Sequence, residues 1–237
     1  MKRTPNRATN RKATRDGHAA TAPTRPNLLT GEDLPPAPRQ RRSLENRERL
    51  KAAALRLFGR QGYAGTSIEE IAGHADLAVG GFYLHFRTKR QLLVALMDDL
   101  LQALSEVDLQ MDSSTEPRKA LRALLSRAFS TDLQFLGAYR AWQEVILTDA
   151  ELAGKHKDIH AWTTWRVLRT FQFLQTLPRA RPGVDVEGLA CVIDTFFWAL
   201  LAEALRLPRI ELDHWLDSAT DLIFHALFVD HQKVVNT

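Results

Sequence analysis

Apolar residues along most of the chain recur every three to four positions, the spacing of one face of an α-helix. The first such stripe follows Ser43, which suits an N-cap, and is expected to end near Gly62. Its members are Leu50, Ala53, Ala54, Leu57 and Phe58. We find no strand-like alternation of any length and no internal repeat. The pattern predicts an all-α fold.

Three further helices are predicted to follow in close succession, two short ones and a longer fourth. Thr66-Ser67-Ile68-Glu69 has the sequence of a capping box, in which we expect the Thr66 hydroxyl to cap the Glu69 amide. A third helix is expected over 79–86, and a fourth begins at Thr88 and carries a leucine stripe from Leu92 to Leu104. Short helices with a tight turn before the third are typical of a helix-turn-helix.

The rest of the chain again follows helical spacing. We expect helices over about 121–129, 135–147, 149–177, 185–208 and 211–229, with Pro178 and Pro182 ending the long third one. The predicted organisation is a disordered basic arm over 1–42, a helix-turn-helix domain over 43–91 and a helical domain over 92–237.

Charge is divided unevenly between the two halves of the chain. Residues 1–97 carry a net +10 and residues 98–237 a net −6, which together give the overall +4. The proline-rich first 42 residues alone contribute +7. This division favours a polyanionic partner for the N-terminal half. Composition alone leaves open that the arm is only a soluble basic tail.

Several function classes are disfavoured by what the sequence lacks. The single Cys191 cannot form an internal disulfide, no apolar stretch follows the N-terminus, and charges interrupt the most apolar run at 186–207. We therefore expect a soluble, cytoplasmic protein. We find no G-x-S-x-G, phosphate-loop, H-E-x-x-H or CxxC motif, so an enzyme is not expected, and no cofactor is predicted. His156 and His160 have i, i+4 spacing, but no third metal ligand is evident.

One motif is much more specific than a generic helix-turn-helix. Gly62 to Ala72, followed by Gly80-Gly81-Phe82-Tyr83-Leu84-His85-Phe86-Arg87-Thr88-Lys89, resembles the TetR family of transcriptional regulators over about residues 44–97. The resemblance implies an N-terminal DNA-binding domain and a helical domain for effector binding and dimerisation. Asp76 departs from the family pattern, which usually has Gly in this turn, so Asp76 must adopt a left-handed or otherwise tolerant conformation.

The resemblance also implies which residues contact DNA. The positions that match the family's recognition helix and its flanks are Val79, Gly80, Gly81, Tyr83, His85 and Lys89. Hydroxyls and cations at helix starts and in the basic run suit phosphate contacts, and these are Arg42, Arg47, Thr66, Ser67, Thr88 and Lys89. His85 can instead be a structural histidine, and Arg41, Arg42 and Arg47 can form a merely solvated face.

The predicted helix over 185–208 is apolar nearly all round, so other parts of the protein or a second subunit must bury it on every side. The family dimerises through its last two helices, and the expected interface residues here are Phe197, Leu201, Trp215, Ala219, Leu222, Ile223 and Ala226. A monomer whose core covers this helix is the alternative. A two-fold dimer would present two recognition helices to a palindromic operator.

Aromatic residues in the middle helices suggest a pocket for a small hydrophobic or aromatic effector, although each taken alone can be plain core. The expected ligand-binding set is Phe129, Phe135, Tyr139, Trp142, Trp162, Trp165, Arg166, Asp194 and Trp198. Arg140, His156 and His160 are further possible polar anchors. The function predicted from all this is a homodimeric repressor that such an effector releases from its operator. The alternative is a sequence-tolerant architectural DNA-binding protein without an effector, marked by steep salt dependence.

Overall fold

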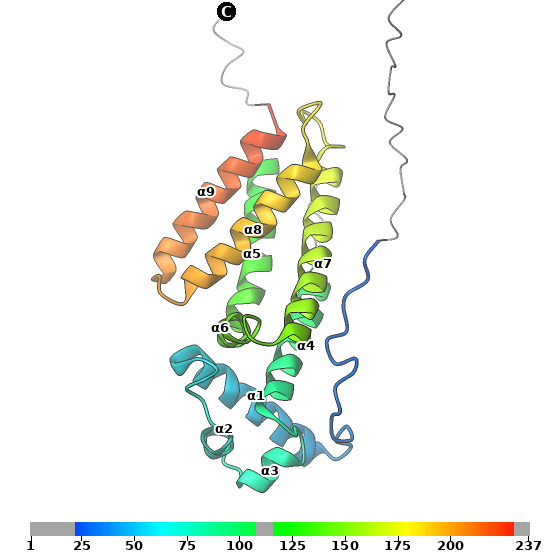
Figure 1. The fold of residues 1–237 in the computed structure, drawn as a ribbon. Helices are drawn as coiled ribbons and strands as arrows, with labels where there is room; N and C mark the ends of the chain where they lie inside the picture. Colours follow the sequence, from blue (N-terminus) through cyan, green and yellow to red (C-terminus); the bar gives the residue numbers. More distant parts are fainter. Residues whose placement is uncertain (1–21, 108–115, 230–237) are drawn as a thin grey trace, which may run out of the picture.

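The computed structural model describes residues 22–107 and 116–229, in which all named secondary-structure elements are helices (Figure 1). Helices in the N-terminal part are α1 (Arg41–Gln61), α2 (Ile68–His74), α3 (Val79–Tyr83) and α4 (Lys89–Glu106). Those in the C-terminal part are α5 (Pro117–Gln134), α6 (Leu136–Val145), α7 (Ala150–Leu174), α8 (Val186–Ala204) and α9 (Arg209–Leu227). Within these ranges the only β-type pairing is an isolated bridge between Ala180 and Phe228. The predicted all-α fold is confirmed.

Helix α4 connects the two parts of the molecule. Helices α1 to α3 lie at one end and α5 to α9 at the other, and α4 runs without a break from the first group to the second (Figure 1). The expected domain boundary after residue 91 therefore falls inside a continuous helix.

The helix starts follow local side-chain chemistry, with one change of register. Ser67, not Thr66, caps α2, because its hydroxyl accepts the Glu70 amide and the Glu70 carboxylate accepts the Ser67 amide. The expected Thr66–Glu69 capping box is thus wrong by one residue. Thr88 caps α4 as expected. Asp76 has φ +50°, which confirms the left-handed conformation that the turn requires, and its carboxylate is 2.7 Å from Arg49.

The third helix is shorter than the sequence indicates. It ends at Tyr83 rather than near Phe86, because residue 88 already has the extended backbone of the next N-cap. Phe82 and Phe86 are fully buried and lie 5.9 Å apart between ring centroids, so they anchor α3 to the core as expected.

Helix α6 is the part of the C-terminal bundle that packs against α1. At their crossing a Cβ on Gly137 would lie 1.9 Å from the Leu55 carbonyl oxygen, so only glycine permits this approach. Beside the crossing, the Glu144 carboxylate accepts the backbone amides of Tyr63 and Ala64 at 2.8 and 3.1 Å. The two halves are therefore joined by a close backbone contact and by a carboxylate at the end of α1.

The segment over 22–40, predicted as part of a disordered arm, is instead packed on the molecule. Leu28 is 1% exposed, and its amide and the Arg25 guanidinium both bond to Asp98 of α4, each at 3.0 Å. Gln91 donates to the Asp33 carbonyl at 2.9 Å. The expectation of disorder is wrong for these residues because three leucines, Leu28, Leu29 and Leu34, contact the core. Residues 1–21 of the predicted arm lie outside the described residues.

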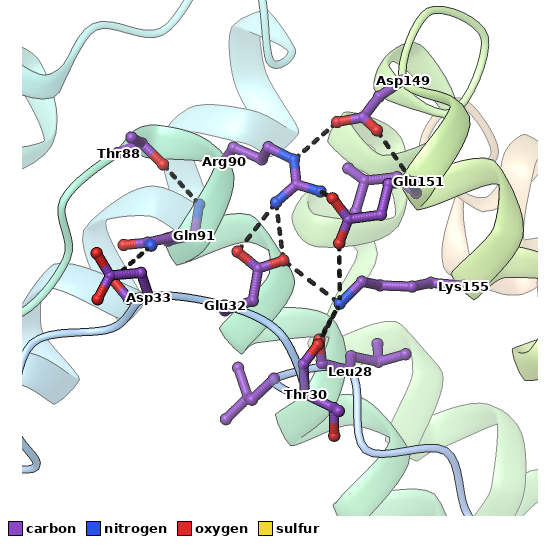
Figure 2. A network of polar contacts seen from close by, with 12 residues as sticks. Leu28, Thr30, Glu32, Asp33, Thr88, Arg90, Gln91, Asp149, Glu151 and Lys155 are labelled. Atoms are coloured by element: carbon purple, nitrogen blue, oxygen red, sulfur yellow. Dashed lines mark hydrogen bonds and ion pairs between the residues drawn. The ribbon is translucent and has the colours of Figure 1, made fainter.

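Glu32 of this segment lies at the centre of a polar network that joins α4 to α7 (Figure 2). Arg90, in the first turn of α4, bonds to Glu32 and to Asp149, the N-cap of α7, at 2.7 Å each. Lys155 of α7 reaches Glu32 at 3.4 Å and the Thr30 carbonyl at 3.1 Å. Burial disfavours the charged guanidinium, but these hydrogen bonds outweigh that effect and raise the pKa of Arg90. The start of α4 is thus fixed to both the N-terminal segment and the bundle.

Candidate nucleic-acid interface and ligand cavity

The short helix α3 lies at the tip of the N-terminal part (Figure 1), and several side chains on it and just after it are exposed. Val79 is 36% exposed, Tyr83 50% and the following Leu84 71%. The Tyr83 ring meets Phe82 edge-on at 5.5 Å, so the buried phenylalanine supports the exposed tyrosine. Leu84 was not expected at this surface, since in sequence it continues the apolar run toward Phe86.

Gly80 is not required by the packing of this chain. A Cβ added there would meet nothing within 4 Å, and its φ is not positive. At Gly81 a Cβ would make ordinary contact with Leu77 at 3.4 Å. Since neither internal contacts nor backbone conformation demands glycine at position 80, the absence of a side chain there leaves room for an external partner.

Two of the expected phosphate-binding cations are already engaged within the fold. Arg47 donates to the His85 carbonyl at 3.1 Å and lies 4.4 Å from the centroid of the Phe86 ring. Lys89 donates to the Tyr63 carbonyl at 2.6 Å and also to that of Thr66. Burial lowers the pKa of both side chains. Both fasten the helix-turn-helix together, and their contact with DNA stays a prediction.

Thr66 and His85 do not fit the direct DNA contacts expected of them. Thr66 is 2% exposed and its hydroxyl donates to the Gly62 carbonyl, so it serves the turn after α1. His85 is 3% exposed, and burial and then Arg47 lower its pKa. The alternative of a structural histidine describes His85 better. Sequence pattern did not reveal this, because both residues lie beside exposed ones.

The other expected DNA-binding residues remain at the surface of this end. Arg42 and Thr88 are exposed and Ser67 is half-buried. The Ser67 and Thr88 hydroxyls accept bonds as N-caps, which leaves each O–H free to donate outward. These side chains, together with the α3 surface, form the candidate nucleic-acid interface.

A cavity of about 140 Å³ lies between α4, α5, α7 and α8. Its walls are largely apolar and include Leu100, Leu101 and Leu104 of α4. Five of the nine expected ligand-binding residues line it, namely Phe129, Trp162, Arg166, Asp194 and Trp198. Phe171 also lines the cavity, and so does Phe197, which was expected at the dimer interface. A cavity of this size accommodates about one aromatic ring.

The other four expected residues do not line the cavity. Tyr139 and Trp142 are buried in the core, and the Tyr139 hydroxyl donates to the Trp198 carbonyl at 2.8 Å. Phe135 packs against the same core, and Trp165 is half-buried outside the cavity wall. Arg140 instead donates to the Gly59 carbonyl at 2.8 Å, at the α1–α6 crossing. Aromatic composition alone does not separate core rings from pocket rings.

Most polar side chains that line the cavity have partners within the protein. Arg166 donates to the Leu104 and Val107 carbonyls at the end of α4, and its guanidinium lies 4.8 Å from the Trp162 ring centroid. Asp194 accepts the Thr164 hydroxyl at 2.8 Å. Asp132, which sequence analysis did not select, lines the cavity from α5, and desolvation raises its pKa to about 7. The leucine stripe of α5 gave no signal for it.

His156 and His160 form an aromatic cluster with Trp198 beside the cavity. The rings of the two histidines lie 4.6 Å apart, and the Trp142 indole N–H donates to His156 Nδ1 at 3.3 Å. Burial, and then His160, lowers the pKa of His156 to about 4. In the part of the chain that the structure describes, no group of three or more His, Cys, Asp or Glu side chains is placed to hold a metal ion.

The expected dimer interface is divided between two faces of the last helices. Leu201, Ala219 and Ile223 are buried within this chain, and Phe197 lines the cavity, so these four were assigned to the wrong face. Leu222 and Trp215 are 58% and 38% exposed, and Ala226 is half-buried. Trp215 stacks on Phe196 of α8 at 6.5 Å, and Val192 of α8 is 63% exposed. An apolar face over α8 and α9 is thus left uncovered.

None of the helices in the described ranges is long and apolar enough to cross a membrane.

Residues 50–96 match the family model described as bacterial regulatory proteins, tetR family. The HTH-type regulator YerO of Bacillus subtilis is 43% identical over 51 residues, which cover 22% of this chain and only 18% of YerO. The probable HTH-type regulator ArpR of Pseudomonas putida is 26% identical over 193 residues, covering 76% of this chain and 91% of ArpR.

A solved structure extends the likeness to the whole fold. The structure of the SmeT–triclosan complex matches this chain with a TM-score of 0.59 and 23% identity. The match covers 81% of this chain and 96% of the SmeT chain. The segment that matches the family model, residues 50–96, spans the second half of α1, all of α2 and α3 and the start of α4, and it includes the exposed surface of α3 described above. Residues 50–96 therefore form a helix-turn-helix domain of the tetR family of bacterial regulatory proteins, and the chain is a DNA-binding transcriptional regulator.

Proposed function

We propose that this regulator acts as a homodimeric repressor that a small, largely apolar effector releases from a palindromic operator. The observation that carries the proposal is that α4 contacts both sites. Its N-terminal turn is tied to the helix-turn-helix through Lys89, and its C-terminal part lines the cavity with Leu100, Leu101 and Leu104.

Operator contact is assigned to the surface around α3. Val79, Tyr83 and Leu84 present apolar and hydroxyl groups suited to thymine methyls and base edges or phosphates, and Gly80 lets the helix approach closely. Few of these side chains can read bases by paired hydrogen bonds. Operator choice is therefore expected to depend partly on DNA shape.

Effector release is assigned to a shift of α4. An occupant of the cavity would press on the α4 leucines and on Arg166, which holds the last carbonyls of α4. Since α4 is continuous, the shift would reach Lys89 and Arg90 and alter the position of α3. A difference in affinity of about 1–3 kcal/mol between two such states is enough for regulation.

Dimerisation is assigned to the exposed apolar face of α8 and α9. A single chain leaves the apolar side chains of this face exposed to solvent, namely Val192, Trp215 and Leu222. In a two-fold symmetric dimer the same face of the second copy would cover them. The dimer would hold two α3 surfaces at a fixed separation, which matches a palindrome. We assign no catalytic role to the chain and place its action in the cytoplasm, where its operator lies.

The experiment is a titration of the purified protein against DNA from upstream of its own gene, with a scrambled duplex alongside, at two salt concentrations. Light scattering gives the mass of the protein and of the complex. Binding that prefers the upstream DNA, by a species of twice the chain mass, supports the proposal. Equal affinity for both duplexes with steep salt dependence would favour the alternative of an architectural protein without an effector.

A further inference from the structure

The cavity contains one polar side chain whose bonding capacity is not used by the chain. Among the described residues, nothing donates a hydrogen bond to Asp132, and no Lys, Arg or His nitrogen lies within ion-pairing distance of its carboxylate. The other polar side chains of the lining are engaged. Thr163 and Thr170 donate to backbone carbonyls of their own helix, and Asp194 accepts from Thr164 and contacts His160 at 3.2 Å.

The charge balance of the lining favours a positive rather than a negative ligand group. Two carboxylates, Asp132 and Asp194, face the cavity against the single guanidinium of Arg166. Both terminal nitrogens of Arg166 donate to the carbonyls at the end of α4. An anionic ligand would have to break these bonds, whereas a cationic ligand finds a carboxylate with no bonds to break.

We infer that Asp132 is the polar anchor of the effector site and that it selects lipophilic cations, that is, amines or amidines attached to an aromatic or aliphatic body of about one ring. The apolar body would lie among Leu101, Phe129 and Trp162, and the ammonium group would pair with the Asp132 carboxylate. This inference rests on the proposed function, since it assigns a ligand class to the proposed effector cavity.

Pairing with a cation also predicts a proton linkage. Desolvation raises the pKa of Asp132 to about 7, Arg166 of α7 opposes this shift and Asp194 of α8 adds to it, while α4 contributes only apolar side chains to the lining. A bound cation favours the ionised carboxylate, so binding at pH 7 should release roughly half a proton per ligand. Affinity for the cation should rise from pH 6 to pH 8, and affinity for a neutral ligand should not.

The test compares three probes with one apolar body, which are 3-phenylpropylamine, the neutral 3-phenylpropanol and the anionic 3-phenylpropionate. Calorimetry on the full chain at pH 8 measures their dissociation constants, and repetition in two buffers of different ionisation enthalpy at pH 7 measures proton release. The variants are Asp132→Asn and, as the matched control, Asp158→Asn on the exposed side of α7.

We expect the amine to bind the wild-type protein at least tenfold more tightly than the alcohol, with proton release, and the carboxylate to bind most weakly. Asp132→Asn should reduce binding of the amine to the level of the alcohol and abolish proton release, while Asp158→Asn should change neither. An alcohol or carboxylate that binds as tightly as the amine would overturn the inference, and so would failure of all three to bind.

Operator binding, measured in parallel, separates this inference from the proposed function. If the amine binds through Asp132 but does not weaken operator binding, the ligand class holds and effector release is wrong. If the neutral alcohol releases the operator from the wild type and from Asp132→Asn alike, effector release holds and the role of Asp132 is wrong.

Discussion

Arg90, in the first turn of the helix that follows the DNA-binding unit, is bound to Glu32 of the N-terminal segment by two hydrogen bonds of 2.7 and 2.9 Å. The Glu32 side chain is only 5% exposed, and Lys155 of α7 contacts it from the other side (Figure 2). This carboxylate therefore joins three segments that lie far apart in the sequence. It braces the position of the DNA-binding unit relative to the effector bundle.

Replacing Glu32 with Gln should lower the free energy of unfolding by about 1–3 kcal/mol. The cost stays below that of most broken buried ion pairs because Arg90 keeps Asp149 and Glu151. Denaturant unfolding measures the change. Glu45→Gln, which removes an exposed pair with Arg41, should change stability by less than about 0.5 kcal/mol. Equal changes in unfolding free energy for the two substitutions would contradict the role of Glu32 in joining the three segments.

Gly137→Ala should separate α6 from α1. The new Cβ would lie 1.9 Å from the Leu55 carbonyl oxygen, so the helices must move apart, at a cost of roughly 1–3 kcal/mol in unfolding free energy. Gly154→Ala is the matched control, because it meets nothing within 4 Å in the exposed part of α7. That control should be neutral or stabilise the protein slightly. A stable Gly137→Ala protein with unchanged operator affinity would show that the close crossing is unimportant.

Gly80→Ala should affect DNA binding in the opposite direction to stability. Space is open around this position, so alanine should raise the free energy of unfolding by about 0.5–1 kcal/mol. At the same time the methyl group would hold α3 off the duplex and weaken operator binding by about tenfold, the loss of one good contact. Thermal unfolding and operator titration measure the two effects. Full operator affinity in this variant would mean that the surface at Gly80 does not face DNA.

Acid should destabilise the folded protein through His156. Burial lowers its pKa from 6.5 to about 4, so below pH 6.5 the unfolded chain binds a proton that the folded chain does not. Stability from this group is fully present above pH 6.5 and is lost as the pH falls toward 4, by roughly 1–3 kcal/mol. Asp132 has the opposite dependence between pH 4 and 7, because its pKa is raised. The difference in unfolding free energy between the wild type and His156→Asn isolates the histidine and should shrink on acidification. A difference that is constant from pH 7 to pH 4 would contradict a half-buried His156 that stays neutral in the folded protein.

Leu222→Asp should split the proposed dimer without unfolding the chain, because Leu222 is 58% exposed and lies in the uncovered face of α9. Light scattering should report a single chain mass for this variant. The same change at Leu147, 84% exposed in the loop between α6 and α7, should leave the dimer intact. A wild-type protein that is already monomeric at micromolar concentration would rule out the interface.

More of the fold than of the candidate site could be predicted from the sequence. Periodicity placed the helices, and the turn at Asp76 and the cap at Thr88 followed from local chemistry. Thr66-Ser67-Ile68-Glu69-Glu70 fits a capping box in two registers, and only tertiary packing, which buries Thr66, selects the second. Leu28 had no periodic neighbours among the prolines, so its burial was not foreseen.

The sequence pattern indicates where the helices lie more clearly than it indicates which face of each helix is buried. Helix α9 is apolar on both sides, and the pattern does not say that Ile223 faces α5 while Leu222 faces outward. For the same reason Asp132 was overlooked, since one acidic residue in an amphipathic helix usually lies in solvent. Which side of a helix is covered depends on its neighbours in space, and these are not encoded in its own sequence pattern.

The most direct test of the account is the ratio of operator affinity to scrambled-duplex affinity for the wild type and for Tyr83→Ala. Tyr83 is half exposed at the C-terminal end of α3, so its replacement should leave the fold and the mass in solution unchanged. We predict a wild-type preference of about a thousandfold or more, the lower bound for specific recognition, and a ratio near one for Tyr83→Ala. A Tyr83→Ala protein that retains the wild-type ratio would contradict the assignment of α3 as the surface that recognises the operator.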